Sequence, residues 1–420
     1  MKKLLVAFYC LSFSVCASAQ FSVSTSGGYL SLTSIPNLDA LILFNGITPM
    51  SEITYTGTAS NITWVTFDNQ FYSNSSTISP EDGTGYILKI NDVNTYWIWV
   101  IDYAKYPVIL SALSVVESDD RCDNLKLIPL FTAPDLTYQN KNGATLILPR
   151  AFSFTYNDVT FSDDAWTDPT PVVITKTTPF SEVNLVTPFC NTQITMSGDQ
   201  FAVDMGLTPQ SVTSAIYQAV AVESHMKGTV SERTAKNELN RSGSDISGSG
   251  PLVVDFESRV NTLSANYYEW FIFKTTDPSN YIRYNDKNLR YTFTESGNYR
   301  ARLVAASSAC EMIDSLSITV LESSLEVPNV FTPNGDGIND EFRVVYKSLS
   351  SYSCLVFNRW GRKVFSSSDP GRGWDGRING KMAAPGAYYY IVQATGTDFD
   401  SDGNPITYKL SGDINLLRGK

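Results

Sequence analysis

The chain has 420 residues, of which 43% are hydrophobic and 12% aromatic, and its formal net charge is −11. One hydrophobic core rarely supports this length, so several domains are expected, and the abundance of Tyr, Phe, Thr, Val and Ile favours strands over helices. The negative charge argues against binding to nucleic acid and against polybasic docking to a membrane, because both surfaces are themselves negative.

The first nineteen residues have the pattern of a secretory signal peptide. A short basic start precedes the apolar run 4–15, which is too short for a stable membrane anchor. Small residues follow it, and they predict cleavage between Ala19 and Gln20. No later run reaches the eighteen apolar residues of a membrane helix. The sequence therefore predicts export of the chain from the cytoplasm.

Residues 20–116 predict a first β-sandwich domain, because short strand-forming runs alternate there with glycine-containing turns. In the run 94–100, Trp97 and Trp99 point to one side and smaller apolar residues to the other. A strand with two apolar faces indicates a central strand of a sandwich. The alternative is an aromatic platform for sugar rings or for a protein partner.

Two further β-rich domains are predicted at 117–186 and 187–241. The first contains an Asn142-Gly143 dipeptide between two strand-forming runs, which is typical of a hairpin turn. After them, the Ser/Gly-rich residues 242–250 predict a flexible linker.

Removal of the signal peptide leaves four cysteines, Cys122, Cys190, Cys310 and Cys354. Disulfides are chemically allowed outside the cytoplasm, and four cysteines permit three pairings. Cys122 with Cys190 is the preferred pair, since both lie near the edges of one predicted domain; buried thiols are the alternative. Cys354 lies in an apolar strand and is expected to belong to a core.

Residues 251–323 place Trp270 in a central strand and continue with the pattern Y-x-F-x-E-x-G-x-Y-x-A-x-L from Tyr291. This is a strand, a glycine turn and an alternating strand. The segment resembles a PKD-like module of the immunoglobulin-like β-sandwich class, although the Trp-Asp-Phe-Gly-Asp-Gly run of the best-known members is absent. The resemblance implies a spacer or adhesive unit of a surface protein.

Residues 324–420 carry five motifs in order: P-N-x-F-T-P-N-G-D-G-I-N-D from 328, F-N-R-W-G-x-x-V-F from 357, W-D-G from 374, P-G-x-Y-Y-Y from 385, and a basic terminal strand. Physically they are strands and sharp turns in which glycine supplies a positive φ. The motif residues are Pro328, Asn329, Phe331, Pro333, Asn334, Gly335, Asp336, Gly337, Asn339, Asp340, Asn358, Arg359, Trp360, Gly361, Trp374, Asp375, Gly376, Gly386, Tyr388 and Arg418.

In this combination the region 325–420 resembles the gliding-motility-associated, type B C-terminal sorting domain of the type IX secretion system of Bacteroidetes. The resemblance implies passage through the Sec system and then recognition by the outer-membrane translocon. It also implies a PorP/SprF-like outer-membrane partner.

Two acidic loops have a spacing that invites a calcium reading. Asp398, Asp400 and Asp402 alternate before a glycine, but Lys409 stands where a closing carboxylate is needed, so a hairpin turn is favoured over calcium. In the loop 328–340, Asx-type turns and capping of backbone N–H groups are favoured in the same way.

Catalysis has little support in the sequence. His225 is the only histidine and is more simply explained as a partly exposed residue at a strand end, and the scattered cysteines argue against a zinc site. No nucleophile elbow, phosphate-binding loop or dinucleotide fingerprint occurs. The 42 acidic residues leave a two-carboxylate glycosidase open.

The sequence thus predicts an all-β protein: tandem immunoglobulin-like β-sandwich domains followed by a β-sandwich sorting domain. The favoured function is a non-enzymatic secreted or cell-surface protein, an adhesin or a component of a surface assembly, with a surface glycan or protein as its ligand. The alternative is a secreted carbohydrate-binding or polysaccharide-active protein.

Overall fold

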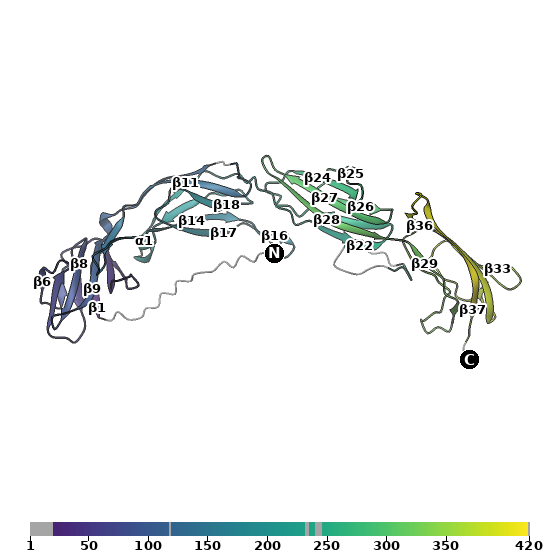
Figure 1. Cartoon of the computed structure of the whole chain (residues 1–420), viewed down its shortest axis with the longest axis horizontal. Helices are drawn as coiled ribbons and strands as arrows, with labels where there is room; N and C mark the ends of the chain where they lie inside the picture. Colours follow the sequence, from purple (N-terminus) through teal and green to yellow (C-terminus); the bar gives the residue numbers. More distant parts are fainter. Residues whose placement is uncertain (1–19, 117–118, 232–234, 240–245, 419–420) are drawn as a thin grey trace. The chain divides into compact units, whose positions relative to one another are not determined.

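The computed structural model describes residues 20–116, 119–231, 235–239 and 246–418 (Figure 1). The predicted signal peptide, and with it Ala19 of the predicted cleavage site, lies outside these ranges. In the described part of the chain the only helices are α1 (Gln200–Asp204) and the 3-10 turn η1 (Tyr103–Lys105), and every other regular element is a strand. The prediction of an all-β fold is confirmed.

The chain divides into two compact units. The first holds the described residues up to Asp158 together with Pro169–Gln218. The second holds Val159–Asp168 together with the described residues from Ala219 onward.

The first unit begins with a two-sheet sandwich. Its core lies between the sheets and contains Phe44, Trp64 and Tyr86, each fully buried. One sheet has the strand order β1 (Phe21–Ser24), β4 (Glu52–Tyr55), β7 (Thr77–Ile78); the other has the order β2 (Tyr29–Leu32), β3 (Ala40–Phe44), β9 (Val93–Asp102), β8 (Thr84–Ile90), β5 (Ile62–Thr66), β6 (Phe71–Ser73).

Strand β9 is central in the six-stranded sheet, between β3 and β8. Trp99 is buried, and both Trp97 and Trp99 pack edge-on against Phe67, with ring centroids 5.0 and 5.6 Å apart. The second face of the sheet is covered by side chains of α1 and of the hairpin β12–β13 (Leu136–Gln139 and Thr145–Leu148), among them Tyr138 and Phe201. The central-strand interpretation is confirmed, because both faces of β9 are covered.

A second sandwich completes this unit, and its core includes Leu127, Phe152, Phe154 and Met196. One sheet has the order β10 (Ile109–Val116), β11 (Asn124–Thr132), β18 (Val183–Val186); the other has the order β17 (Thr170–Thr177), β14 (Ala151–Asp158), β19 (Thr195–Gly198), β20 (Gln210–Thr213). The Asn142-Gly143 hairpin is present as β12–β13, and Gly143 has φ +78°.

The pairing in this sandwich corrects two predicted boundaries. Strand β10 pairs with β11, so the sandwich begins before residue 117. Strand β19 pairs with β14, so strands on both sides of the predicted 186/187 boundary share one sheet, and 187–241 is not a separate domain. Alternation of apolar residues indicates a strand but not its partner, which explains both errors.

A buried ion pair ties several elements of the first unit together. Arg150 donates Nε–H to a carboxylate oxygen of Asp199, and the two side chains are 1% and 0% exposed. The Arg150 Nη1 group also donates to the carbonyls of Tyr106 at 2.9 Å and Pro134 at 3.0 Å. Tyr103 donates its hydroxyl to Asp199 at 2.7 Å. Burial, followed by this bond, raises the pKa of Tyr103. The pair is therefore hydrogen-bonded on both sides, as a buried pair requires.

The second unit contains an immunoglobulin-like sandwich whose core is built around Phe256, Trp270 and Phe293. Trp270 donates its indole N–H to the carbonyl of Asp286 at 2.9 Å. The sheets have the orders β21 (Lys227–Val230), β23 (Leu252–Glu257), β26 (Asn288–Phe293) and β22 (Ile246–Ser249), β28 (Glu311–Leu321), β27 (Gly297–Ala306), β24 (Tyr267–Lys274), β25 (Tyr281–Tyr284).

The structure of this sandwich differs from one prediction and agrees with another. The predicted linker 242–250 is shorter than expected, because residues 246–249 form β22 and pair in parallel with β28; the preceding residues 242–245 lie outside the described ranges. The predicted strand, glycine turn and strand at 291–303 are present. The two strands are β26 and β27, and the turn between them leads from one sheet to the other.

The C-terminal sandwich of the second unit carries the motifs. Its core contains Phe331, Val356, Trp374, Val392 and Ile414. The main sheet has the order β30 (Val330–Phe331), β37 (Pro405–Leu416), β36 (Gly386–Phe399), β32 (Leu349–Phe357), β33 (Lys363–Ser367), and two small sheets pair β29 (Ser324–Glu326) with β31 (Val345–Lys347) and β34 (Arg377–Ile378) with β35 (Lys381–Met382).

Candidate functional site

The loop after β30 is closed by the carboxylate of Asp340. One of its oxygens accepts the N–H groups of Asn334 at 2.9 Å and Gly335 at 2.7 Å, and the other accepts that of Gly337 at 2.8 Å. These bonds, led by the one from Gly335, hold the pKa of Asp340 below its ordinary value. Gly335 and Gly337 have φ +86° and +85°, which L-residues resist.

Asn334 and Asp336 complete this loop with Asx-type turns. The Asn334 side-chain oxygen accepts the N–H of Asp336 at 3.1 Å, and the Asp336 carboxylate accepts that of Ile338 at 2.8 Å. The oxygens that looked like metal ligands in the sequence are therefore occupied by backbone donors. This is the arrangement of turns and caps that the sequence predicts.

The W-D-G motif lies in the core. Trp374 is 1% exposed, and its ring packs against Phe331 and Tyr388 with centroids 5.4 and 4.8 Å apart. Its indole N–H donates to the carbonyl of Arg377 at 2.9 Å. Gly376 has φ +72°, and a Cβ there would lie 3.0 Å from Pro333 Cγ. The motif thus fixes a turn against the first loop of the domain.

The F-N-R-W-G motif forms the turn between β32 and β33. The Asn358 side-chain oxygen accepts the N–H groups of Trp360 at 3.1 Å and Arg362 at 3.0 Å. Gly361 has φ +75° and donates to the carbonyl of Asn358. Trp360 is 74% exposed at the tip, with the Arg359 guanidinium 4.2 Å from its ring centroid.

The remaining motif residues serve backbone geometry or packing. Arg418 donates to the carbonyl of Gly376 at 3.1 Å, and Tyr388 donates to the carbonyl of Ala384 at 2.9 Å. Asp375 accepts the N–H of Arg377 at 3.0 Å, and the Asn329 carbonyl accepts the N–H of Asn415 at 2.9 Å. Asn339 and Gly386 have positive φ angles of +51° and +135°. Pro328 leads into β30.

The acidic hairpin between β36 and β37 is also closed by a carboxylate. Asp400 accepts the N–H groups of Asp402 at 3.0 Å and Asn404 at 2.8 Å, and the bond from Asn404 is the main cause of its lowered pKa. Asp398 accepts the N–H of Ser323 at 3.1 Å. In the described parts of the chain no group of three or more His, Cys, Asp or Glu residues is arranged to hold a metal ion. The hairpin turn fits these contacts better than calcium.

The cysteines differ from the preferred prediction. Cys122 is disulfide-bonded, and so is Cys310. Cys190 is buried and keeps its thiol, whose Sγ lies 3.5 Å from the carbonyl oxygen of Asn157. The predicted Cys122–Cys190 pair is therefore wrong, because Cys122 is bridged while Cys190 is not, although both lie near the edges of one predicted domain. Cys354 keeps its thiol in the core, as expected, and burial raises its pKa.

His225 lies in an aromatic stack. Its ring is parallel to that of Phe161, with centroids 4.0 Å apart, and is edge-on to Trp166 in the hairpin β15 (Phe161–Ser162) and β16 (Ala165–Trp166). Its Nε2 is 2.8 Å from a carboxylate oxygen of Glu223. These contacts explain the single histidine as a packing residue of the second unit.

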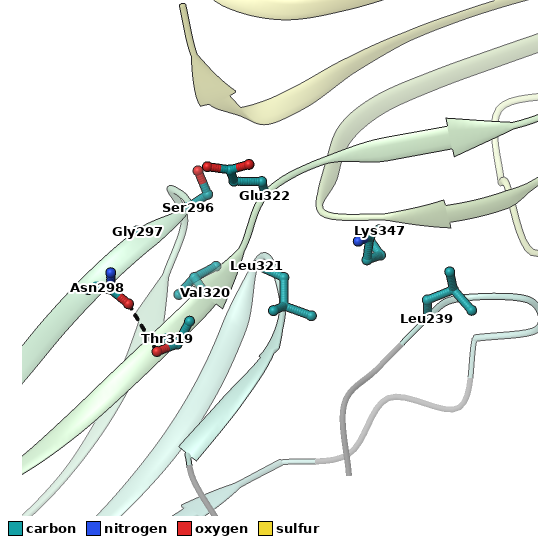
Figure 2. A pocket seen from close by; sticks show the side chains of 9 residues that line it. All are labelled: Leu239, Ser296, Gly297, Asn298, Thr319, Val320, Leu321, Glu322 and Lys347. Atoms are coloured by element: carbon teal, nitrogen blue, oxygen red, sulfur yellow. Dashed lines mark hydrogen bonds between the residues drawn. The ribbon is translucent and has the colours of Figure 1, made fainter. Parts of the chain in front are cut away.

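A cavity of ≈ 530 Å³ opens beside strands β27 and β28. Figure 2 shows the side chains that line it. Among the described residues that line it, Glu322 is the only carboxylate and Lys347 is the only cation. Thr319 donates its hydroxyl to the side-chain oxygen of Asn298 at 3.0 Å (Figure 2). A two-carboxylate glycosidase site needs a second acid, which the described part of this lining does not supply.

One feature of the C-terminal domain escaped the sequence analysis. The outward-facing residues of β32 and β36 include Phe357, Tyr389 and Ile391, and with the turn after β32 they line a cavity of ≈ 610 Å³. The alternation in 386–394 contained the signal, since Tyr389 and Ile391 alternate with the core-facing residues Tyr388, Tyr390 and Val392 and must face outward.

Three solved structures illustrate distant likenesses to this chain. A tetra-tandem repeat from the extending region of a large adhesion protein is 12% identical and covers 89% of this chain and 98% of its own, with a TM-score of 0.21. Sidekick-1 immunoglobulin domains 1–5 are 11% identical and cover 94% of this chain and 78% of their own, with a TM-score of 0.26. The chicken CNTN1 FN1–FN3 domains are 12% identical and cover 73% and 98%, with a TM-score of 0.24. No curated protein matches the sequence.

Family models match two regions of the chain. Residues 114–214 match a fibronectin type III domain, Fn3_FA, which agrees with the single sandwich that replaces the predicted second and third domains. No helix of the described residues is long and apolar enough to cross a membrane. Residues 325–404 match the CHU_C type IX secretion signal domain, so the chain is a substrate of type IX export, bound for the cell surface or the medium.

Proposed function

We propose that the protein is a non-enzymatic adhesin or surface-assembly component, displayed by its C-terminal sorting domain. The observation that supports this most directly is the order of the modules: three β-sandwiches precede one secretion signal domain. The immunoglobulin-like sandwich at 251–323 would act as a PKD-like spacer. The sorting domain would be delivered to the translocon by a PorP/SprF-like outer-membrane partner.

The fibronectin-type sandwich offers a candidate ligand surface on the outer face of β17-β14-β19-β20. Cross-strand pairs on one face of a sheet lie side by side. The register therefore gives two rows across the four strands: Val173, Thr155, Thr195, Thr213 and Thr175, Ser153, Ser197, Ser211. Seven of these eight side chains are hydroxyls, and Thr195 and Thr213 hydrogen-bond to each other at 3.0 Å.

This hydroxyl face is uncharged, although the chain as a whole carries a net charge of −11. Each hydroxyl both donates and accepts hydrogen bonds, as the hydroxyls of a sugar do. A flat, neutral array of this kind suits a neutral glycan better than an ionic ligand. We therefore assign the adhesin role to glycan binding by the hydroxyl face.

A glycan array probed with the full mature chain tests this assignment. Thr195→Lys places a charge in the centre of the hydroxyl face and should abolish saturable binding. Thr132→Lys, at an exposed position of β11 in the opposite sheet, is the matched control and should bind as the wild type does. Equal binding by both variants would show that the glycan-binding site lies outside the hydroxyl face. Saturable binding of the wild type to neither glycan nor protein would refute the adhesin role in this form.

The export route has its own test. Deletion of 325–420 should leave the protein in the periplasm, and cell fractionation would measure this. Arrival of the truncated chain at the cell surface or in the medium would refute the role of this domain in sorting.

A further inference from the structure

We propose that the sorting domain is recognised through one exposed surface, the basic–aromatic face, and that its occupant is an acidic segment with apolar side chains in an outer-membrane protein. The face consists of Phe357, Arg359, Trp360, Lys363, Tyr389 and Ile391 on β32, β33, β36 and the turn between the first two. This inference rests on the proposed sorting function and names the surface that performs it.

Several motif side chains already have partners within the domain. The side chains of Asp340, Asn358 and Trp374 are engaged inside the domain, as described above. Trp374 fills the core, and Asp340 and Asn358 already accept backbone N–H groups of their own turns. Among the motif side chains, Arg359 and Trp360 stand out from the surface together.

The exposure of Trp360 is unusual within this chain. The other six tryptophans are all buried or half-buried, whereas Trp360 is 74% exposed. Leaving so large an apolar ring in water forfeits the stabilisation that burial would give. Tryptophan and arginine are also the residues most enriched at the centres of protein interfaces. The stacked pair therefore has the composition of a binding anchor.

The strand register extends this anchor into a continuous surface. Lys363 pairs with Phe357, Phe357 with Tyr389, and Tyr389 with Asp413, so these side chains form one row. Leu355 pairs with Ile391 in the next row. Tyr389 and Ile391 are 51% and 42% exposed. An apolar centre thus lies between cations at one end and a single carboxylate at the other.

Charge identifies the occupant. Residues 325–420 contain 11 of the 31 basic and 10 of the 42 acidic residues, a net charge of +1, which leaves −12 for the preceding 324 residues. Arg359, Arg362 and Lys363 are all exposed and lie within five residues of each other. Complementary charge speeds encounter and suppresses wrong partners. An acidic segment with an apolar or aromatic side chain matches both features of the face.

Export of the full chain in a type IX-competent host tests the proposal. The triple variant Arg359→Glu, Arg362→Glu, Lys363→Glu and the single variant Trp360→Ala should each lower the exported fraction at least tenfold, with accumulation in the periplasm. Lys381→Glu and Met382→Ala, at exposed positions of β35, are the matched controls and should be exported as the wild type is. Thermal unfolding of each purified full chain would confirm that the fold is retained.

The deletion of 325–420 distinguishes a failure of the basic–aromatic face from a failure of the sorting function. If the deletion is retained but the face variants are exported normally, the face is wrong and the sorting function stands. If the deletion itself is exported, the sorting function fails.

A photo-crosslinking amino acid supplies a measurement that does not depend on loss of export. Placed at 360, it should crosslink to an outer-membrane protein through a segment containing Asp or Glu beside apolar residues. Placed at 382, it should not. Crosslinking that is equal at the two positions, absent at 360, directed to a basic segment, or directed to this chain itself would overturn the proposal.

Discussion

Short polar side chains determine the turns of the sorting domain. Asp340, Asn358 and Asp400 each accept two or more backbone N–H groups from the residues around them. Each turn also contains a glycine with positive φ. A motif rich in Asn, Asp and Gly therefore encodes backbone geometry, and its carboxylates serve as acceptors for backbone N–H groups.

The closure by Asp340 should depend on pH. Its pKa is lowered in the folded state, so its contribution is fully present above the unfolded carboxyl pKa and is lost as pH falls through the folded value. The protection of the Gly335 and Gly337 amides against hydrogen exchange, relative to their intrinsic exchange rates at each pH, should therefore fall in acid. In Asp340→Asn the protection of these amides should be low at every pH, because the charged acceptor is gone. Protection of the same size in the variant at neutral pH would contradict this account.

Two tryptophans of this domain should differ sharply in their effect on stability. Trp374 fills the core, and its replacement by alanine should cost about 3–5 kcal/mol, whereas Trp360→Ala should change stability by about 0.5 kcal/mol or less. Urea unfolding of the full chain, followed by pulsed hydrogen exchange on sorting-domain peptides, would measure both. Comparable losses would mean that Trp360 has a packing role.

Strand pairing limits how much of this fold can be read from the sequence. The turns, the apolar alternation and the central position of β9 were predictable, because each depends on neighbours along the chain. The pairing of β14 with β19, the addition of β22 to a sheet and the state of Cys122 depend on residues far apart in sequence. A period of two assigns a residue to a face, but it carries no information about which strand lies beside it.

The candidate site shows the same limit. The motif residues were found, since their order along the chain is distinctive. Their division into inward and outward side chains was not, because an exposed Trp360 and a buried Trp374 look alike in a sequence. The basic–aromatic face needs the register of β33, β32 and β36, which only the folded chain supplies.

The buried pair of Arg150 and Asp199 should be essential for joining the elements of the first unit. Arg150→Met removes the cation and leaves a buried carboxylate, which should cost about 3–5 kcal/mol. Adding Asp199→Leu removes the second charge and should restore part of the loss. A double-mutant cycle measured by urea unfolding would show this non-additivity. Simple addition of the two losses would mean that the pair is not coupled.

Within the second unit, the immunoglobulin-like sandwich and the sorting domain are joined by buried hydrogen bonds. Ser348 accepts the N–H of Gly250 at 2.9 Å and donates to the carbonyl of Leu321, and its own N–H donates to Ser249 at 2.6 Å. Ser296 donates its N–H to the carbonyl of Thr397 at 3.0 Å. Because the bonds connect strands of both sandwiches, the two should unfold together.

Ser348→Ala tests this coupling. The change leaves a buried N–H and a buried carbonyl without the hydroxyl, and each such group costs about 1–3 kcal/mol. Ser350→Ala, which removes an exposed hydroxyl two residues away, is the control and should shift stability by about 0.5 kcal/mol or less. In Ser348→Ala, unfolding of the two sandwiches should separate into two transitions by hydrogen exchange. A single shared transition in the variant would show that other contacts carry the coupling.

The use of most motif residues for turns and for core packing has a consequence for how such chains are found and sorted. The motifs leave positions 362, 363 and 391 open, so two chains can share every motif and still present different charges and apolar side chains around Trp360. A receptor that binds the outer surface does not bind an unfolded copy, because Trp360, Tyr389 and Lys363 come together only when the sheet has formed. Correct folding is then required for export, and a core defect such as Trp374→Ala would be observed in cells as a loss of export.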